Sequence, residues 1–250
     1  MLDVPTDRRA DFKRWSDDTI DALGAGLDAE ASMRVEISII EFAQYFAGVI
    51  AERRRAPGKD LLSLLVDPAN GETLSDGDLV SFAILLLVAG NETTTKLIGN
   101  TLLALQRHPV ERAKVVADRG RIPDAVEEAL RYEGSTQVMA RTLTRDAELH
   151  GVTMREGAKV LLLLGSANRD ERVWDRPDVF DIDRVGTTHH VGFGHGIHVC
   201  LGAALARLEM RVSLEELLAR APGYEIDESG LTRVHSGNVR GYSSMPMLVG

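Results

Sequence analysis

The stretch from Ser75 to Pro109 constrains the fold most, because its residue pattern is helical and no proline interrupts it. Ser75 and Asp76 are residue types that cap the N-terminus of a helix. With a rise of about 1.5 Å per residue, a helix over this stretch would be roughly 50 Å long. It is therefore expected to cross a whole domain.

The chain before this helix is also expected to be helical. Its pattern predicts two long helices between residues 5 and 56, joined by a short loop at Gly24 and Gly26. A brief apolar segment and a turn should fill residues 60–72. This half of the chain therefore contributes helices and no predicted strands.

The pattern after this helix changes near residue 138. Residues 138–165 combine alternating apolar and polar residues, a glycine turn and an apolar run, which indicates strands and hairpins. A small strand pair is also expected at the C-terminus. Residues 168–184 are expected to be irregular. The predicted helices cover residues 108–120, 122–134 and 201–220. Pro123 suits the first turn of the second, and the third is expected to be strongly amphipathic. The fold class is therefore mainly α with small β-sheets (α+β), in a single domain of residues 1–250.

Composition excludes several classes of protein. A net charge of −9 argues against a nucleic-acid-binding protein, because the phosphate backbone attracts clustered positive charge. The apolar run from Leu79 to Gly90 is too short to span a membrane, and the N-terminus lacks the apolar core of an export signal. The single cysteine cannot form an internal disulfide, so a cytoplasmic location is expected.

The only cysteine, Cys200, lies in the glycine-rich loop "GFGHGIHVCLG" of residues 192–202. Its four glycines would let the main chain approach a large flat ligand closely. The helix predicted directly after the loop would stabilise a thiolate at its N-terminus. These features would suit a reactive or metal-binding cysteine.

Several interpretations of this loop remain open. Cys200 could be a buried structural cysteine, a nucleophile with a histidine base, or a thiolate ligand of haem iron. A zinc site would draw on His195, His198 and Cys200, although structural zinc sites usually use more cysteines. A dinucleotide-binding fingerprint fails, because Ile197 stands where its third glycine should be.

A haem site predicts polar groups elsewhere in the chain. In the long helix, Gly90 and Thr93 are three residues apart and share a face, so a flat ligand could lie on Gly90 beside the threonine hydroxyl. Glu92 and Thr93 could together relay protons, whereas the alternative is that Glu92 faces solvent. Arg141 and His198 could bind the carboxylates of such a ligand.

Glu128 and Arg131 lie one helical turn apart in the segment "EEALR". Most pairs with this spacing are surface ion pairs that contribute little to stability. The order and spacing of all these features together favours the haem interpretation.

With these motifs the chain resembles the cytochrome P450 family of the soluble bacterial type. Residues 193–202, "FGHGIHVCLG", match the haem-binding loop, and residues 89–93, "AGNET", match the oxygen-activating part of the long helix. Residues 128–131, "EALR", match the family's Glu and Arg pair. By the same resemblance Arg184 completes a structural triad and Arg141 binds a haem propionate.

The resemblance implies a haem-thiolate monooxygenase that inserts one oxygen atom from dioxygen into an apolar small molecule. Cys200 would ligate the iron of haem b, and Glu92 and Thr93 would be the catalytic residues. Electrons would come from NAD(P)H through a ferredoxin and a ferredoxin reductase, and Arg207 and Arg211 would offer that acidic partner a basic patch. The residues implied in haem binding are Ala89, Gly90, Arg141, Phe193, Gly194, His198, Cys200 and Gly202.

The chain begins in the middle of the family pattern, so the fold is expected to lack its N-terminal part. That loss would expose the apolar face of the long helix around residues 82–88, and the chain alone would be poorly soluble or bind haem weakly. Two other functions remain open: a haem-poor remnant or interaction protein without catalysis, and a zinc or cysteine hydrolase.

Overall fold

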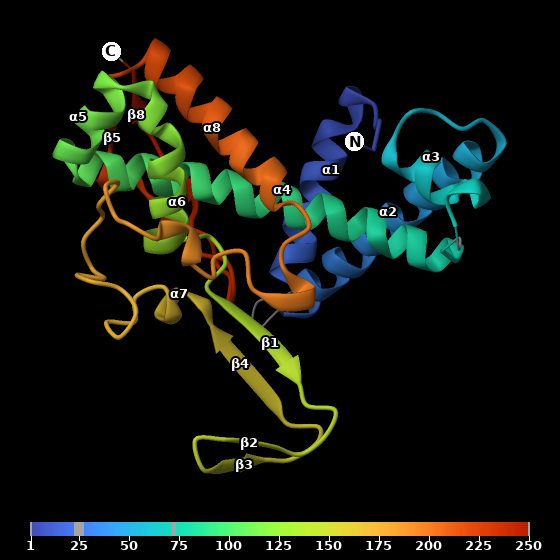
Figure 1. Ribbon diagram of the computed structural model, residues 1–250. Coiled ribbons are helices and arrows are strands. Elements are labelled where there is room, and N and C mark those ends of the chain that lie inside the picture. Colours follow the sequence, from blue (N-terminus) through green and yellow to red (C-terminus); the bar gives the residue numbers. More distant parts are fainter. Residues whose placement is uncertain (1, 23–27, 72–73, 250) are drawn as a thin grey trace. The chain divides into compact units, whose positions relative to one another are not determined.

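The computed structural model describes residues 2–22, 28–71 and 74–249, and confirms a mainly helical fold with small β-sheets (Figure 1). The chain divides into two compact units, Met1–Glu92 and Thr93–Gly250, called here the N-terminal and C-terminal units. The expectation of a single domain stays a prediction. The loop predicted at Gly24 and Gly26 lies outside the described residues.

The long helix α4 spans Asp76–Arg107 and confirms the most constraining prediction. Ser75 precedes it as expected of a cap, because its Oγ accepts a hydrogen bond from the backbone N–H of Asp78 (3.1 Å). The helix ends just before Pro109, where the next helix begins. The boundary between the two units falls within α4, after Glu92.

Two further helices of the N-terminal unit begin directly after aspartates. Asp28 accepts a hydrogen bond from the N–H of Ala31 (2.8 Å), and Asp60 accepts one from the N–H of Ser63 (3.0 Å). Both carboxylates satisfy backbone donors that a first helical turn leaves unpaired. The elements are the short 3₁₀ turns η1 (Thr6–Arg8) and η2 (Pro68–Asn70), and the helices α1 (Arg9–Asp21), α2 (Ala29–Arg55) and α3 (Leu61–Val66).

An aromatic cluster forms the core of this unit and covers one side of α4. Phe12 packs edge-on against Trp15 with ring centroids 5.2 Å apart, and both belong to one buried cluster with Ala83 and Val88 of α4. The expected exposure of residues 82–88 is therefore wrong for most of this face. Leu85 is the exception among its large apolar side chains, since 60% of it is exposed.

The C-terminal unit is built around helices α6 and α8. Both α5 and α6 carry proline in the first turn, as the sequence predicts for Pro123. Besides the second half of α4, the helices are α5 (Pro109–Ala117), α6 (Ile122–Glu133), α7 (Leu164–Ala167) and α8 (Ala203–Arg220). Short 3₁₀ turns are η3 (Arg119–Arg121), η4 (Thr187–His189), η5 (Gly196–His198) and η6 (Glu228–Gly230).

Helix α8 differs from the strongly amphipathic helix that its sequence predicts. Its inner side is apolar and buried, and its outer side also carries large apolar side chains, which are exposed. A helix with one polar face and one apolar face would separate these groups. The buried residues are Met210, Leu214 and Leu218, and the exposed ones are Leu205, Leu208 and Val212.

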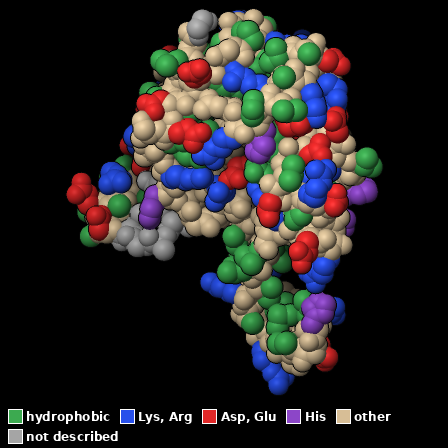
Figure 2. Space-filling view, turned by 90° about the vertical axis from the view of Figure 1, so that its left-hand side faces the viewer, with side chains coloured by type: hydrophobic (Ala, Val, Ile, Leu, Met, Phe, Trp, Pro, Cys, Tyr) green, Lys and Arg blue, Asp and Glu red, His purple; other side chains and the backbone are tan. Residues whose placement is uncertain are grey.

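The strands form antiparallel pairs within the C-terminal unit. Strand β1 (Val138–Thr142) pairs with β4 (Lys159–Leu163), and the β2–β3 hairpin (Ala147–Leu149 with Val152–Met154) continues beyond them. In Figure 2 this projecting arm carries many hydrophobic side chains, among which Leu149, Val152 and Leu161 are exposed.

Two strand pairs, rather than the single predicted pair, lie near the C-terminus. They are β5 (Glu225–Ile226) with β8 (Met247–Leu248), and β6 (Thr232–Arg233) with β7 (Tyr242–Ser244). Each strand is only two or three residues long, too short to show a clear alternation in the sequence.

The face drawn in Figure 2 carries basic side chains interspersed with acidic ones. Among the described residues, no helix combines the length and the apolar character that a membrane crossing requires.

Candidate functional site

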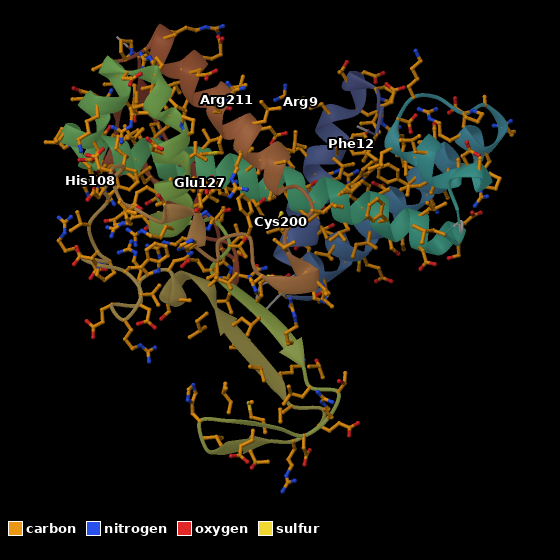
Figure 3. The ribbon with its side chains drawn as sticks, viewed as in Figure 1. Arg9, Phe12, His108, Glu127, Cys200 and Arg211 are labelled. Carbon is orange, nitrogen blue, oxygen red and sulfur yellow. The ribbon has the colours of Figure 1, made fainter. Side chains whose placement is uncertain are left out.

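The cysteine loop has the backbone conformation that its glycines predict. Gly194 and Gly196 both have φ of +73°, a region that residues with a Cβ rarely adopt. Within the loop, the N–H of Cys200 donates a hydrogen bond to the carbonyl oxygen of Phe193 (2.9 Å). Gly202 is the N-cap residue of α8, so Cys200 lies directly before this helix (Figure 3).

Cys200 is exposed, so its interpretation as a buried structural cysteine is wrong. Exposed apolar side chains surround it in the sequence: Ile197 is 99% exposed, Val199 55% and Leu201 77%. A Cβ added at Gly202 would stand 4.0 Å from Cys200 Sγ, and the glycine leaves this space open. The loop thus presents one thiol together with apolar side chains, which suits a flat apolar ligand with a metal at its centre.

The geometry does not support the zinc interpretation. In the described part of the chain, the ligand atoms of His195, His198 and Cys200 do not all lie within 4.8 Å of one another, as a shared metal ion would require. The chain's carboxylates do form such a group at Glu111, Asp181 and Asp183, but Lys114 forms ion pairs with Glu111 and Asp183.

Glu128, Arg131 and Arg184 come together in the C-terminal unit. Arg131 donates to both carboxylate oxygens of Glu128 (2.8 Å each), and Arg184 Nε lies 3.3 Å from the same carboxylate. The side chains of Glu128 and Arg131 are completely buried, so the alternative of a surface pair is wrong. The backbone N–H of Asp181 also donates to Glu128 (2.9 Å), which ties the irregular segment to α6.

The predicted residues of α4 are divided between the two units. Ala89 and Gly90 are exposed in the N-terminal unit, whereas Thr93 is half-buried in the C-terminal unit. Glu92 is only 6% exposed, so the alternative that it faces solvent is wrong. Lys13, whose pKa is raised first by its hydrogen bond to Asp17, is also held in its charged form by the charge of Glu92.

The two residues predicted to bind carboxylates lie on separate elements of the C-terminal unit. Arg141 is half-buried on β1, opposite Val160, and its Nη1 donates to the carbonyl oxygen of Ala140 (2.9 Å). His198 is exposed in η5, two residues before Cys200.

Sequence reasoning missed a polar network at the start of the cysteine loop. His190 Nδ1 accepts a hydrogen bond from the N–H of Gly192 (3.0 Å), so its Nε2 carries the proton and donates to Glu127 (3.2 Å). Asn168 Oδ1 accepts from the N–H of Val191 (2.8 Å). The available signal was the first glutamate in "EEALR", Glu127, which lies on a different helix face from Glu128.

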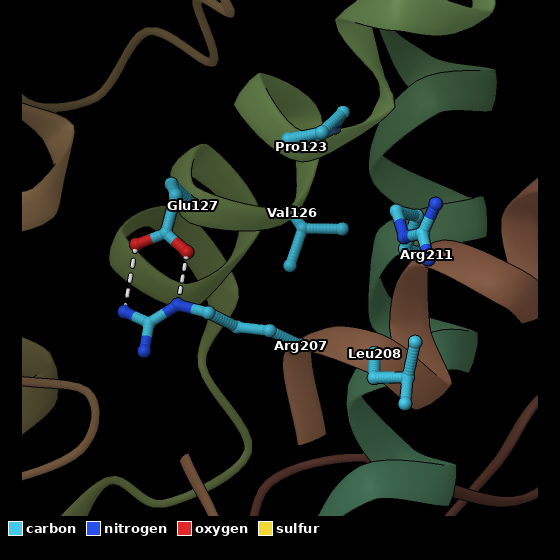
Figure 4. A pocket seen from close by; sticks show the side chains of 6 residues that line it. All are labelled: Pro123, Val126, Glu127, Arg207, Leu208 and Arg211. Carbon is cyan, nitrogen blue, oxygen red and sulfur yellow. Dashed lines mark hydrogen bonds and ion pairs between the residues drawn. The ribbon is translucent and has the colours of Figure 1, made fainter. Parts of the chain in front are cut away.

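Glu127 also binds Arg207 of α8 through both carboxylate oxygens, with a distance of 3.0 Å between Arg207 Nη2 and Oε2 (Figure 4). Burial alone would raise the pKa of Glu127, but the hydrogen bonds from His190 and Arg207 outweigh it and lower the pKa to about 2. This pair borders a cavity of about 260 Å³ between α6 and α8, whose apolar lining comes from Pro123, Val126 and Leu208.

Comparison with known proteins places these features in context. The model of the family "Cytochrome P450" matches residues 34–221. A putative cytochrome P450 123 from Mycobacterium tuberculosis is 49% identical over 211 residues, covering 84% of this chain and 52% of that protein. Cytochrome P450 107B1 from Saccharopolyspora erythraea is 40% identical over 254 residues, covering 100% of this chain and 61% of that protein.

Solved structures agree with this likeness. P450BioI, crystallised with an acyl carrier protein ligated to hexadec-9Z-enoic acid, is 37% identical with a TM-score of 0.92, over 99% of this chain and 63% of that one. Cytochrome P450 CREJ, in complex with (4-ethylphenyl) dihydrogen phosphate, is 33% identical with a TM-score of 0.94, over 99% and 62%. The chain spans between half and two thirds of the length of these proteins.

Proposed function

Since the chain belongs to the cytochrome P450 family, we propose that it acts as a haem-thiolate monooxygenase on an apolar small molecule. It would insert one oxygen atom from dioxygen, using electrons from a separate redox partner. The observation that carries this proposal is the exposed thiol of Cys200, presented by a glycine loop among apolar side chains. We further infer that residues 1–250 form one cytoplasmic haem-thiolate domain.

The residues of the loop fit haem b. Cys200 Sγ would be the ligand of the iron, and Phe193, Gly194 and Gly202 shape the loop that holds it. Haem supplies the iron that activates dioxygen, and a thiolate ligand favours cleavage of the O–O bond. His198 and Arg141 would bind the propionates. By the family resemblance, Ala89 and Gly90 of α4 would also contact the haem.

Glu92 and Thr93 would handle the protons of the reaction. The Thr93 hydroxyl can donate and accept a hydrogen bond, and Glu92 can hold a proton next to it along α4. Glu92 is only 6% exposed, so its carboxyl group lies away from bulk water, where it could pass a proton to or from the neighbouring Thr93 hydroxyl.

The partners and substrate are inferred from chemistry and from relatives. Arg207 and Arg211 on α8 are the basic groups proposed for a ferredoxin, which a reductase would supply with electrons from NAD(P)H. Both arginines already have a carboxylate partner, Glu127 for Arg207 and Glu215 for Arg211, and both remain partly exposed. An apolar substrate agrees with the relative named steroid C26-monooxygenase from Mycolicibacterium smegmatis.

An absorption experiment tests the proposal. The purified protein, loaded with haem, is reduced and exposed to carbon monoxide, and its iron and zinc contents are measured. The shifted band of a thiolate-ligated haem, with iron and without zinc, is the expected result. Protein that binds no haem would instead favour a haem-poor remnant or interaction protein, and zinc without iron would favour a hydrolase.

The Thr93→Ala variant should retain haem but lose control of proton delivery. A positioned proton donor contributes about 10²- to 10⁴-fold to a reaction step, so product formed per electron should fall at least about tenfold while peroxide rises. Peroxide and product are measured per NAD(P)H consumed. Thr95→Ala, at an exposed position on the same helix, is the control and should leave this ratio unchanged. An unchanged ratio in Thr93→Ala would remove Thr93 from the mechanism.

A further inference from the structure

The ion pair between Glu127 and Arg207 connects α6 with the cysteine loop. The guanidinium of Arg207 lies over the ring of Phe193, 4.7 Å from its centroid. The carbonyl oxygen of Phe193 accepts the hydrogen bond of the Cys200 N–H. Phe193 thus contacts both Arg207, through its ring, and the backbone of Cys200, through its carbonyl oxygen.

Glu127 also holds the beginning of the same loop. Its second partner, His190, donates from Nε2 to the carboxylate and accepts the N–H of Gly192 at Nδ1. Little space is available for this segment to shift, because a Cβ at Gly192 would stand 2.9 Å from the carbonyl oxygen of Leu130. Through its two partners, one carboxylate therefore contacts the loop at two neighbouring residues, Gly192 and Phe193.

The charge of Arg207 interacts with the charge of a Cys200 thiolate. The hydrogen bond to Glu127 raises the pKa of Arg207, and the charge of the Cys200 thiolate adds a smaller contribution in the same direction. Arg207 is 40% exposed and Glu127 14%, so the carboxylate is the less hydrated member of the pair. A cation beside a metal-bound thiolate withdraws electron density from it, and a carboxylate that pairs with the cation offsets that effect.

We propose that Glu127 is a positioning residue for Cys200, which holds Arg207 on Phe193 and balances its charge beside the thiolate. This inference rests on the proposed function, because it assigns Glu127 a role in setting how strongly the thiolate donates electrons to the iron. Glu127 would act through its two partners, Arg207 and His190, and not as a catalytic residue.

The reduction potential of the iron separates this role from a merely structural one. Glu127→Gln keeps the shape of the side chain and leaves the Arg207 cation unbalanced, so the potential should rise, because positive charge favours the reduced iron. Arg207→Gln leaves the carboxylate unbalanced, so the potential should fall. The double variant should return toward the wild-type value, whereas two independent structural defects would add.

The potentials are measured on the haem-loaded protein without a redox partner, together with the carbon monoxide spectrum. Glu127→Asp keeps the negative charge, so its potential should equal that of the wild type. If Glu127→Gln fails to bind haem, Arg207→Gln and Glu127→Asp still test the inference. Arg220→Gln removes a cation at the last residue of α8, where it forms an exposed pair with Glu216, and is the matched control that should shift nothing.

The outcomes distinguish the two proposals. A wild-type thiolate band with equal potentials in all variants, or with shifts of the same sign in Glu127→Gln and Arg207→Gln, would overturn the inference alone. A wild-type protein without the thiolate band would overturn the proposed function, and this inference with it.

Discussion

The Cys200→Ser variant is expected to lose the thiolate-haem band completely. Cys200 is the only cysteine of the chain, so no other thiolate can replace it. A serine hydroxyl stays protonated near neutral pH and donates far less electron density to iron than a thiolate does. The reduced, carbon monoxide-bound spectrum measures this loss, and the haem content shows whether binding also fails.

A matched control places a hydroxyl next to the ligand and keeps the thiol. Val199→Thr changes an exposed neighbour of Cys200 to a side chain of nearly the same shape. It should retain the band, which would show that the loss in Cys200→Ser comes from the sulfur and not from a disturbed loop. Persistence of the band and of activity in Cys200→Ser would refute the assignment of the iron ligand.

The Glu128→Ala variant should lose about 3–5 kcal/mol of unfolding free energy, because a broken buried ion pair leaves an uncompensated charge. Arg131 would keep its guanidinium at a position with no exposed side-chain surface, and Arg184 and the Asp181 N–H would lose an acceptor. Urea denaturation followed by circular dichroism measures the change.

Glu228→Ala provides the comparison for this prediction. Its ion pair with Arg107 lies in the same unit, but both side chains are about half exposed. Exposed pairs of this kind contribute little to stability, so the denaturation midpoint should hardly move. Equal midpoints in Glu128→Ala and Glu228→Ala would contradict the structural role of the buried group.

Local rules predicted the helices well, because their signals lie close together in the sequence. The Ser75 cap and the proline-free stretch fixed α4, and Pro123 marked the first turn of α6. The i, i+3 spacing also placed Glu128 and Arg131 on one helix face. Arg184 lies in a distant irregular segment, and only the family resemblance associated it with that pair.

Features that depend on packing between distant segments were missed. Glu127 gains its partners from α8 and from the cysteine loop, and no local pattern links these segments. The buried face of α4 depends on the aromatic residues of α1 and α2, which the sequence does not assign to it. Helix α8 carries apolar side chains on its buried and on its exposed side, so its sequence does not show which side is buried. That depends on the elements that pack against it.

The positive φ angles of Gly194 and Gly196 also limit which mutations the codons of these residues tolerate. Any single-base change in a glycine codon that changes the amino acid introduces a residue with a Cβ. At Gly194 and Gly196 such a residue would cost roughly 1–2 kcal/mol through its backbone conformation alone. The neighbours add little, because a Cβ at Gly196 would meet no atom within 4 Å and one at Gly194 would meet only an oxygen at 3.7 Å. Missense mutation at these two codons, which arises from a change of the first or second base, is therefore penalised.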